Sequence, residues 1–277
     1  MRVVLALALL PAACGGPRPA GEPLAPNEPQ GFVVTGDPVS PRGATWTFRG
    51  TVDGTGYDLS GVLLKPPGDG PFPAVILSHG SRGNAAGLAR LVGPTMVQWG
   101  LVCIGVNYTH SEGVPIGRPG DEREPGASRS NLERAHMTRE LLRQLGYVDM
   151  SRIALHGHSM GAWVSAAAAS AWPDDFRVAS TTGGGVRPLR VRRGPAPSED
   201  QVRGIRIPFQ LHHGEADETV PLEWDERLDA ILAEHGVAHE LDVYPGAGHL
   251  QARATPVILE RIHAWYAAHG MFDSAQR

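Results

Sequence analysis

The stretch RIALHGHSMGAWVSAAAAS (residues 152–170) runs from a short apolar segment, through a serine flanked by glycines, into an alanine-rich segment. The apolar segment predicts a buried strand, and the alanine-rich one predicts a helix over 160–171. Ser159 therefore lies at the junction, between Gly157 and Gly161. Glycines can mark an ordinary turn and a serine can cap a helix. A simple cap does not account for the second glycine, so the surrounding sequence has to show whether Ser159 is reactive.

Strand-like and helix-like segments alternate along the rest of the chain. TWTFRG and YDLSGVLLKP predict an opening antiparallel pair, and further strands are predicted at PAVILSHG, LVCIGVNY, RVASTT, IPFQLHHG and HELDVYP. Helices are expected at 88–99, 131–145, 221–234 and 255–268. Short apolar runs separated by helices predict an α/β fold with a mostly parallel central sheet covered on both faces. Reacting groups in such folds lie beyond the carboxyl ends of the strands.

Ser159 is the candidate nucleophile, because a strained strand-to-helix turn exposes a serine only where the residues two positions away are very small. A serine hydroxyl also needs a base, and that base needs an acid to orient it. Asp217 follows one predicted strand and His249 follows the next, so both should reach the sheet edge that carries Ser159. Glu215 and Glu218 are nearby alternatives for the acid.

The anionic intermediate of acyl transfer would need hydrogen-bond donors. We expect them to be the backbone N–H groups of Met160, directly after Ser159, and of Ser81, in the loop after PAVILSHG. The alternative for Ser81 is an ordinary turn. His212 and His213 end a predicted strand, and one of them could line the site.

The other histidines are expected to have structural or surface roles. His79 and His158 flank the predicted catalytic turns. The remaining histidines show no compact ligand spacing, so the sequence predicts no metal site and no cofactor.

The segments PFPAVILSHGSRGN, SRIALHGHSMGA, LHHGEADETVPLE and VYPGAGH resemble, in this order, the blocks of the dienelactone-hydrolase-like branch of the α/β-hydrolase superfamily. The resemblance covers about residues 44–266. The H-G-x-x-D-x-x-V-P block at 213–221 is also similar to the catalytic domain of prolyl-oligopeptidase-like enzymes. The resemblance implies an α/β-hydrolase fold and hydrolysis of carboxylic esters, lactones or related acyl compounds without a cofactor.

Two departures from the family pattern refine this expectation. Dienelactone hydrolases proper carry a cysteine nucleophile, whereas Ser159 stands here, which favours a general esterase with a small-molecule ester substrate. Oligopeptidases carry a large propeller domain ahead of the catalytic one, and only some 40 residues precede it here, so a gated peptidase is not expected. An acyltransferase or peptidase using the same triad, or a non-catalytic binding protein on this scaffold, remain as alternatives.

The N-terminal segment MRVVLALALLPAACGG is typical of a secretory signal peptide, with one basic residue, a short apolar run and small residues before Cys14. Eleven apolar residues are too few to span a bilayer, which needs about 20. The segment resembles a bacterial lipoprotein signal, although Pro11 stands where a leucine is usual. We therefore expect a signal peptide at 1–14, lipidation of Cys14, and export to the bacterial cell envelope with a membrane anchor. Plain export to the periplasm or medium, or a retained anchor, are the alternatives.

The remaining sequence predicts a Pro/Gly-rich tether at 15–43 and one catalytic domain at 44–277. A net charge of −4 gives no support for nucleic-acid binding. Cys103, inside a predicted strand, is expected to be a small core residue. The segment at 185–206 carries six arginines and could form a cap that attracts an acidic substrate or anionic lipid, or a solvated surface loop.

Overall fold

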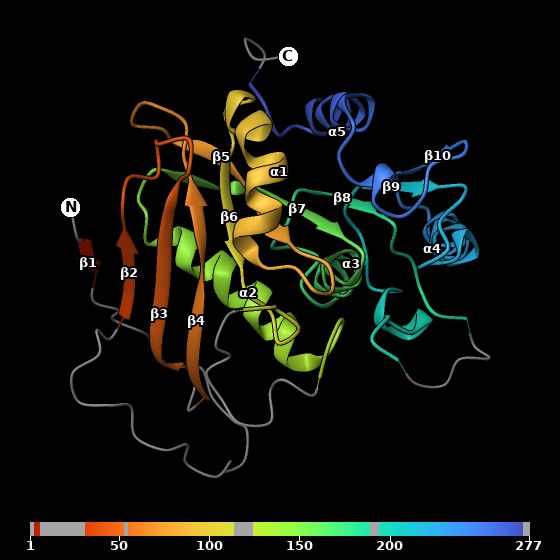
Figure 1. The fold of residues 1–277 in the computed structure, drawn as a ribbon, viewed down its shortest axis with the longest axis horizontal. Coiled ribbons are helices and arrows are strands. Elements are labelled where there is room, and N and C mark those ends of the chain that lie inside the picture. The colour runs from red at the N-terminus through yellow and green to blue at the C-terminus, as the bar shows by residue number, and fades with distance from the viewer. Residues whose placement is uncertain (1–2, 6–30, 53–54, 114–123, 189–193, 274–277) are drawn as a thin grey trace.

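A ten-stranded sheet runs through the computed structural model, which describes residues 3–5, 31–52, 55–113, 124–188 and 194–273. The strands lie in the order β1-β2-β3-β4-β6-β5-β7-β8-β9-β10 (Figure 1). Their bounds are β1 Val3–Leu5, β2 Gly31–Thr35, β3 Ala44–Val52, β4 Thr55–Leu64, β5 Phe72–Ser78, β6 Val102–Val106, β7 Val148–His158, β8 Val178–Thr182, β9 Phe209–Gly214 and β10 His239–Tyr244. Strands β1 to β4 are antiparallel, and β4 pairs antiparallel with β6. From β6 to β10 all neighbours are parallel, as the apolar runs predict.

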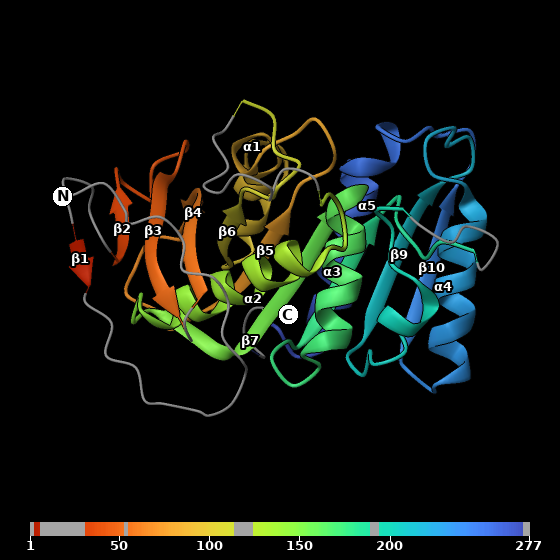
Figure 2. The same ribbon diagram turned by 90° about the horizontal axis from the view of Figure 1, so that it is seen from below.

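Helices cover both faces of this sheet (Figure 2). Their bounds are α1 Ala85–Gln98, α2 Arg129–Arg143, α3 Met160–Ala171, α4 Leu222–Glu234 and α5 Pro256–Ala268. Helices α1 and α5 pack on one face, in a core with Leu77, Val92 and Ile262. Helices α2, α3 and α4 pack on the other, in a core with Ile76 and Leu155. The α/β-hydrolase architecture predicted from the sequence is confirmed.

Capping explains where two helices begin earlier than their apolar periodicity predicts. The Asn84 side chain accepts a hydrogen bond from the Gly87 N–H at 2.9 Å, so α1 begins at Ala85. Ser128 caps α2 in the same way, through the Asn131 N–H. Both caps satisfy donors that the first helical turn leaves without an intrahelical acceptor.

The predicted boundary at residue 44 is wrong, because the sheet begins before it. Strand β2 pairs antiparallel with β3, and Phe32 is buried against the Trp46 ring at a centroid distance of 5.8 Å. Residues 31–43 are therefore part of the folded domain. Residues 6–30, which include Cys14 and most of the predicted tether, lie outside the described residues.

A buried polar seam lies on the α5 face of the sheet, formed by His156, Ser180, His212 and Tyr266. The Ser180 hydroxyl lies 2.9 Å from His156 Nδ1 and 2.8 Å from the Tyr266 hydroxyl. Burial, the main cause in each case, lowers the pKa of His156 to about 4 and that of His212 to about 3. Both rings are therefore neutral at neutral pH.

Cys103 is fully buried and forms no disulfide, which confirms its assignment as a core residue. Among the helices that the structure describes, none has the length and apolar character needed to cross a lipid bilayer.

Candidate active site

Ser159 occupies the sharp turn between β7 and α3. Its backbone has φ 56° and ψ −122°, a left-handed conformation that costs free energy for any residue other than glycine. The surroundings hold this conformation. The Ser159 N–H donates to the Thr182 carbonyl at 2.9 Å, and the Ser159 carbonyl accepts from the Ala162 N–H at 2.9 Å.

The two flanking glycines are needed because the backbone approaches them closely. A Cβ atom at Gly161 would overlap the Ser78 carbonyl group, and one at Gly157 would overlap the Gly161 carbonyl group. A Cβ at Gly80 would lie 3.0 Å from the Ser159 Cβ. The predicted steric reason for the G-x-S-x-G spacing therefore holds, and the loop after β5 packs directly against Ser159.

Asp217 and His249 meet beyond the carboxyl ends of β9 and β10. His249 Nδ1 lies 2.6 Å from Asp217 Oδ2, and the other carboxylate oxygen accepts from the N–H groups of Thr219 and Val220 at 2.8 and 2.9 Å. The Asp217 side chain is almost fully buried. Because Nδ1 is occupied, Nε2 is the ring nitrogen left to act on a substrate or on Ser159. His249 and Ser159 line the same cavity.

The alternative acids do not share this position. Glu215 is exposed and accepts from the Gly246 N–H at 3.1 Å, and Glu218 is exposed. His212 lies in the polar seam described above. His213 lies behind Asp217, and neither His212 nor His213 lines the cavity that holds Ser159.

The loop that carries Ser81 is fixed by His79. The His79 Nδ1–H donates to the Gly80 carbonyl at 2.8 Å, and Nε2 accepts from the Ser111 hydroxyl at 2.7 Å. Since the C=O and N–H of a trans peptide point in opposite directions, holding the Gly80 carbonyl toward His79 turns the Ser81 N–H away from it. Ser81 lines the cavity beside Ser159. Met160 begins α3, so its N–H has no intrahelical acceptor.

Two histidines beside this loop and the turn are neutral. Burial, then the nearby His110, lowers the pKa of His79 to about 3. Burial, then the charges of His249, Arg253 and His156, holds the pKa of His158 well below its ordinary value. The His158 ring packs on the His249 ring at a centroid distance of 4.7 Å, and its Nδ1 lies 2.9 Å from the Thr182 hydroxyl. Both rings thus have the structural roles expected of them, although both also line the cavity.

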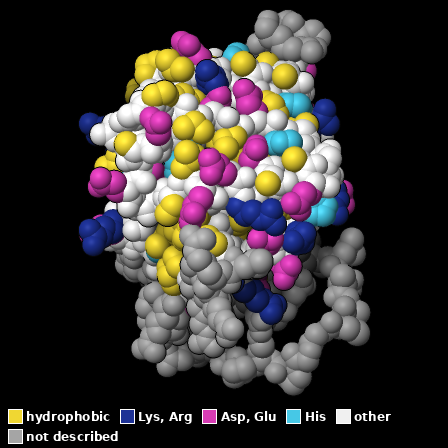
Figure 3. Space-filling view, turned by 90° about the vertical axis from the view of Figure 1, so that its right-hand side faces the viewer, with side chains coloured by type: hydrophobic (Ala, Val, Ile, Leu, Met, Phe, Trp, Pro, Cys, Tyr) yellow, Lys and Arg dark blue, Asp and Glu magenta, His cyan; other side chains and the backbone are white. Residues whose placement is uncertain are grey.

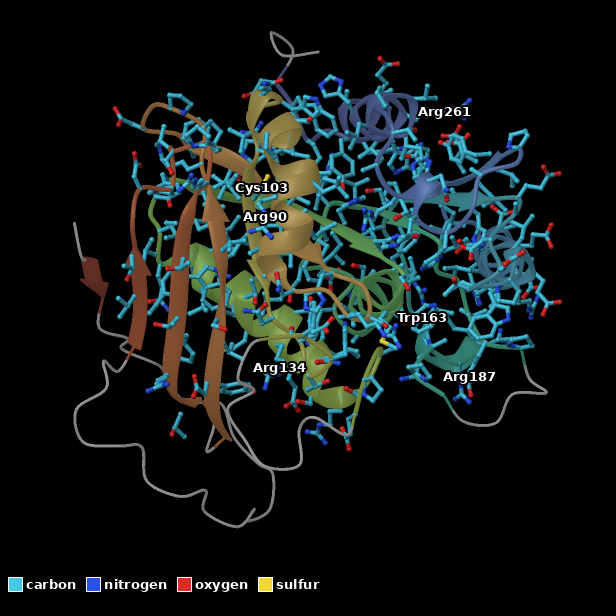
Figure 4. The ribbon with its side chains drawn as sticks, viewed as in Figure 1. Arg90, Cys103, Arg134, Trp163, Arg187 and Arg261 are labelled. Atoms are coloured by element: carbon cyan, nitrogen blue, oxygen red, sulfur yellow. The ribbon has the colours of Figure 1, made fainter. Side chains whose placement is uncertain are left out.

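The cavity that holds Ser159 and His249 has a volume of about 580 Å³, within the usual range for small-molecule sites. Leu88, Leu91 and Leu250 supply apolar surface. Arg82, Arg90 and Arg253 also line it, and no aspartate or glutamate does so among the described residues. Arg90 belongs to α1, and Arg253 follows His249 by four residues (Figure 4 labels Arg90).

The three guanidinium groups have no ion-pair partner in the part of the chain that the structure describes. The Arg253 Nε atom is buried and has no hydrogen-bond partner among the described residues. Acidic and basic side chains are interspersed on the face at the α4 and β10 end (Figure 3). The cavity is therefore a local concentration of positive charge in a chain of net charge −4. The described residues contain no group of three or more histidine, cysteine or carboxylate side chains able to hold a metal ion.

The arginine-rich segment at 185–206 lies apart from this cavity. None of its described residues lines it. Ala196 is buried beside Trp163 of α3, and Glu199 is buried with a 2.8 Å ion pair to Arg227. Residues 189–193, which hold three of the six arginines, lie outside the described residues.

Residues 59–264 match the model of the dienelactone hydrolase family. The chain belongs to this family. A search of curated proteins gave no match. The family match confirms the resemblance found in the sequence.

Solved structures with the same fold include peptidases and esterases. A puromycin-hydrolyzing peptidase of Mycobacterium tuberculosis has 22% identity and a TM-score of 0.65, covering 87% of this chain and 46% of its own. Dipeptidyl peptidase 4 of Porphyromonas gingivalis has 13% identity and a TM-score of 0.67. The match covers 82% of this chain and 36% of the peptidase. A fungal esterase of Rhizomucor miehei has 17% identity and a TM-score of 0.63. The match covers 81% of this chain and 83% of the esterase. This chain spans less than half the length of the two peptidases. The chain is therefore a member of the dienelactone hydrolase family whose fold is shared by peptidases and esterases.

Sequence reasoning missed the three cavity arginines. They stand far apart in the chain, in a loop, on a helix and after the last strand, so only the folded structure brings them together. The position of Arg253, four residues after His249 in the chain, was the one available signal.

Proposed function

We propose that the protein hydrolyses carboxylic esters that carry a negative charge near the scissile bond. The observation that carries this proposal is the set of three unpaired arginines in the cavity of Ser159 and His249. Guanidinium groups without protein partners favour a carboxylate or phosphate on the substrate, because charge-assisted hydrogen bonds are among the strongest in proteins.

The proposed reaction uses the residues in the order that the geometry suggests. Ser159 Oγ attacks the ester carbonyl while His249 Nε2 takes its proton, and Asp217 stabilises the resulting imidazolium. The N–H groups of Met160 and Ser81 donate to the oxyanion. His249 then protonates the departing alkoxide. Water attacks the acyl-enzyme, giving its proton to His249, and the carboxylic acid leaves with Ser159 restored.

The same cavity argues against an aminopeptidase. A substrate with a free N-terminal ammonium group needs a carboxylate to bind it, and the described cavity lining offers arginines instead. Peptide hydrolysis is the activity named for several structural neighbours. For this chain we therefore favour the ester over the aminoacyl substrate.

The first test is reaction of the purified protein with a fluorophosphonate probe, beside Ser159→Ala. Labelling that depends on Ser159, together with ester turnover, supports the nucleophile. If the folded wild-type protein is not labelled, the hydrolase proposal fails, and a non-catalytic binding protein becomes the favoured alternative. Product analysis with added alcohol acceptors separates hydrolysis from acyl transfer.

The second test compares matched substrates. A p-nitrophenyl monoester of a dicarboxylic acid is compared with the methyl-capped diester of the same length, and with the corresponding p-nitroanilide. We expect the anionic ester to be preferred, and Arg253→Gln to reduce its kcat/KM by about 10-fold or more, since one charged hydrogen bond contributes about 1.5–3 kcal/mol. The neutral diester should be little affected. An equal loss for both esters would refute the anionic preference.

We further propose that Cys14 is lipidated and that the protein is anchored in the bacterial cell envelope. Cleavage before Cys14 would remove β1 and leave β2 as the edge strand. Incorporation of labelled palmitate into the wild type, and its loss in Cys14→Ser, is the expected result. Release of an unlabelled protein would support plain export.

A further inference from the structure

The His213 side chain is fully buried near the end of β9, with an acceptor at each ring nitrogen. Nε2 lies 2.9 Å from the Val220 carbonyl oxygen, which can only accept a hydrogen bond. Nδ1 lies 2.6 Å from Asp225 Oδ2, and the same oxygen accepts from the Gly184 N–H at 3.1 Å. Both contacts are best satisfied when both ring nitrogens carry a proton, which makes the ring an imidazolium.

The surroundings favour this charge in spite of burial. Burial lowers the pKa of His213, but the hydrogen bond and charge of Asp225, the Val220 carbonyl and the charge of Asp217 together raise it. Asp225 is itself fully buried, on α4. A buried carboxylate is stabilised by a cation that also donates a hydrogen bond to it.

His213 lies directly behind the proposed catalytic acid. Its Nε2 is 3.5 Å from Asp217 Oδ2, the oxygen that lies 2.6 Å from His249 Nδ1. The Asp217 carboxylate is therefore placed between two histidine rings. His213 also fixes the turn at 217–220, because Asp217 Oδ1 accepts from the Val220 N–H while His213 donates to the Val220 carbonyl.

We propose that His213 is a positively charged positioning residue that, with Asp225, clamps the 217–220 turn and partly balances the charge of Asp217. Its catalytic consequence rests on the function proposed above. A partly balanced Asp217 stabilises a protonated His249 less than a lone carboxylate would. The other groups beside His249 are the neutral His158 ring and Arg253, which lines the same cavity.

The charge itself is tested first, on the wild-type protein. Nitrogen NMR of protein labelled with ¹⁵N-histidine should show one buried ring with both nitrogens protonated at pH 7, in contact with Val220. The signals should be lost in His213→Gln. A neutral His213 ring at pH 7 would overturn the proposal, and this reading does not depend on any catalytic assignment.

The catalytic consequence is tested with the double variant His213→Gln/Asp225→Asn. Glutamine can still donate to the Val220 carbonyl, and asparagine can still accept from the Gly184 N–H, so both charges are removed while hydrogen bonding is kept. The matched control is His239→Gln/Asp229→Asn, a histidine–aspartate pair 3.6 Å apart between β10 and α4, outside the cavity lining.

We expect the acidic limb of the kcat/KM profile to move upward, by up to about one pH unit, in the first double variant. The cation that it removes lies beside Asp217, whereas the carboxylate removed with it lies at the other nitrogen of the ring. The control should leave the limb in place. A lower rate with an unmoved limb would reduce His213 to a structural role and overturn the proposal. If Ser159→Ala retained turnover, the proposed function would fail instead, and the NMR result would stand alone. Should the double variant not fold, His213→Gln alone also removes the cation beside Asp217, and the limb should again move upward.

Discussion

Lowering the pH from 7 to 5 is expected to remove about 6 kcal/mol from the free energy of unfolding, through three buried histidines. The pKa values of His79, His156 and His212 are lowered to about 3, 4 and 3 from an ordinary 6.5, with burial as the largest cause. These rings stay neutral in the folded protein and take up a proton on unfolding. Their stabilising contribution is therefore complete above about pH 6.5 and is lost as the pH falls toward 4 and 3.

The magnitude follows from the number of protons. Each ring contributes about 2 kcal/mol between pH 7 and 5, and the limiting slope is about 1.4 kcal/mol per pH unit per ring. His158 shifts in the same direction. Domains of this kind have a total stability of about 5–15 kcal/mol, so acid unfolding should begin near pH 5.

The assay is urea unfolding at half-unit steps between pH 7.5 and 5, for the wild type, His156→Asn and His235→Asn. Asparagine can still donate to the Ser180 hydroxyl but does not titrate in this range. The slope of the free energy of unfolding against pH should therefore be smaller in His156→Asn, by the contribution of one proton, about 1.4 kcal/mol per pH unit. His235 is exposed, and its variant should follow the wild type. A free energy of unfolding that stays level from pH 7 to 5, or an unchanged slope in His156→Asn, would refute the reasoning.

Three further substitutions test the site and the core. Gly161→Ala should abolish activity and lower stability, because its Cβ would overlap the Ser78 carbonyl; a soluble variant with normal turnover would contradict the elbow geometry. Asp217→Asn should lower kcat by about 10⁴-fold by favouring the wrong tautomer of the base, and rates within tenfold of wild type would exclude this role. Trp46→Phe removes the indole N–H that donates to two backbone carbonyls and should cost about 1–3 kcal/mol in urea unfolding, whereas an unchanged midpoint would show that those carbonyls find other donors.

The order of strands and helices could be predicted because local patterns determine it. Apolar runs and turn residues placed α3 within the right residues, and they placed Asp217 and His249 after the ends of predicted strands. Strand β2 was missed, because GFVVT is short and sits in a Pro/Gly-rich context. Its strand character depends on Phe32 packing against Trp46, a contact that no local pattern reports.

The electrostatics of the site could not be predicted in the same way. Whether His213 is charged depends on the Val220 carbonyl and the Asp225 carboxylate, which reach it only after α4 docks on β9. A histidine at a strand end is equally compatible with a neutral core ring. His212, the preceding residue, is such a ring. Two adjacent histidines on opposite faces of one strand are thus assigned different charge states, neutral for His212 and positive for His213.

Because the two histidines differ in charge, the loss of activity at low pH can be separated into two processes, acid unfolding and an ionisation within the active site. Acid unfolding takes up several protons, so activity lost through it should fall steeply and together with the folded fraction. The ionisation that His213 is proposed to tune involves one proton, and it should give a limb of unit slope in protein that remains folded. If the acidic limb of the activity profile has a slope greater than one, and His156→Asn makes it less steep, then the stability of the fold limits activity at low pH. If the limb has unit slope and moves only in the His213→Gln/Asp225→Asn variant, then the ionisation of the proposed base, His249, limits activity at low pH.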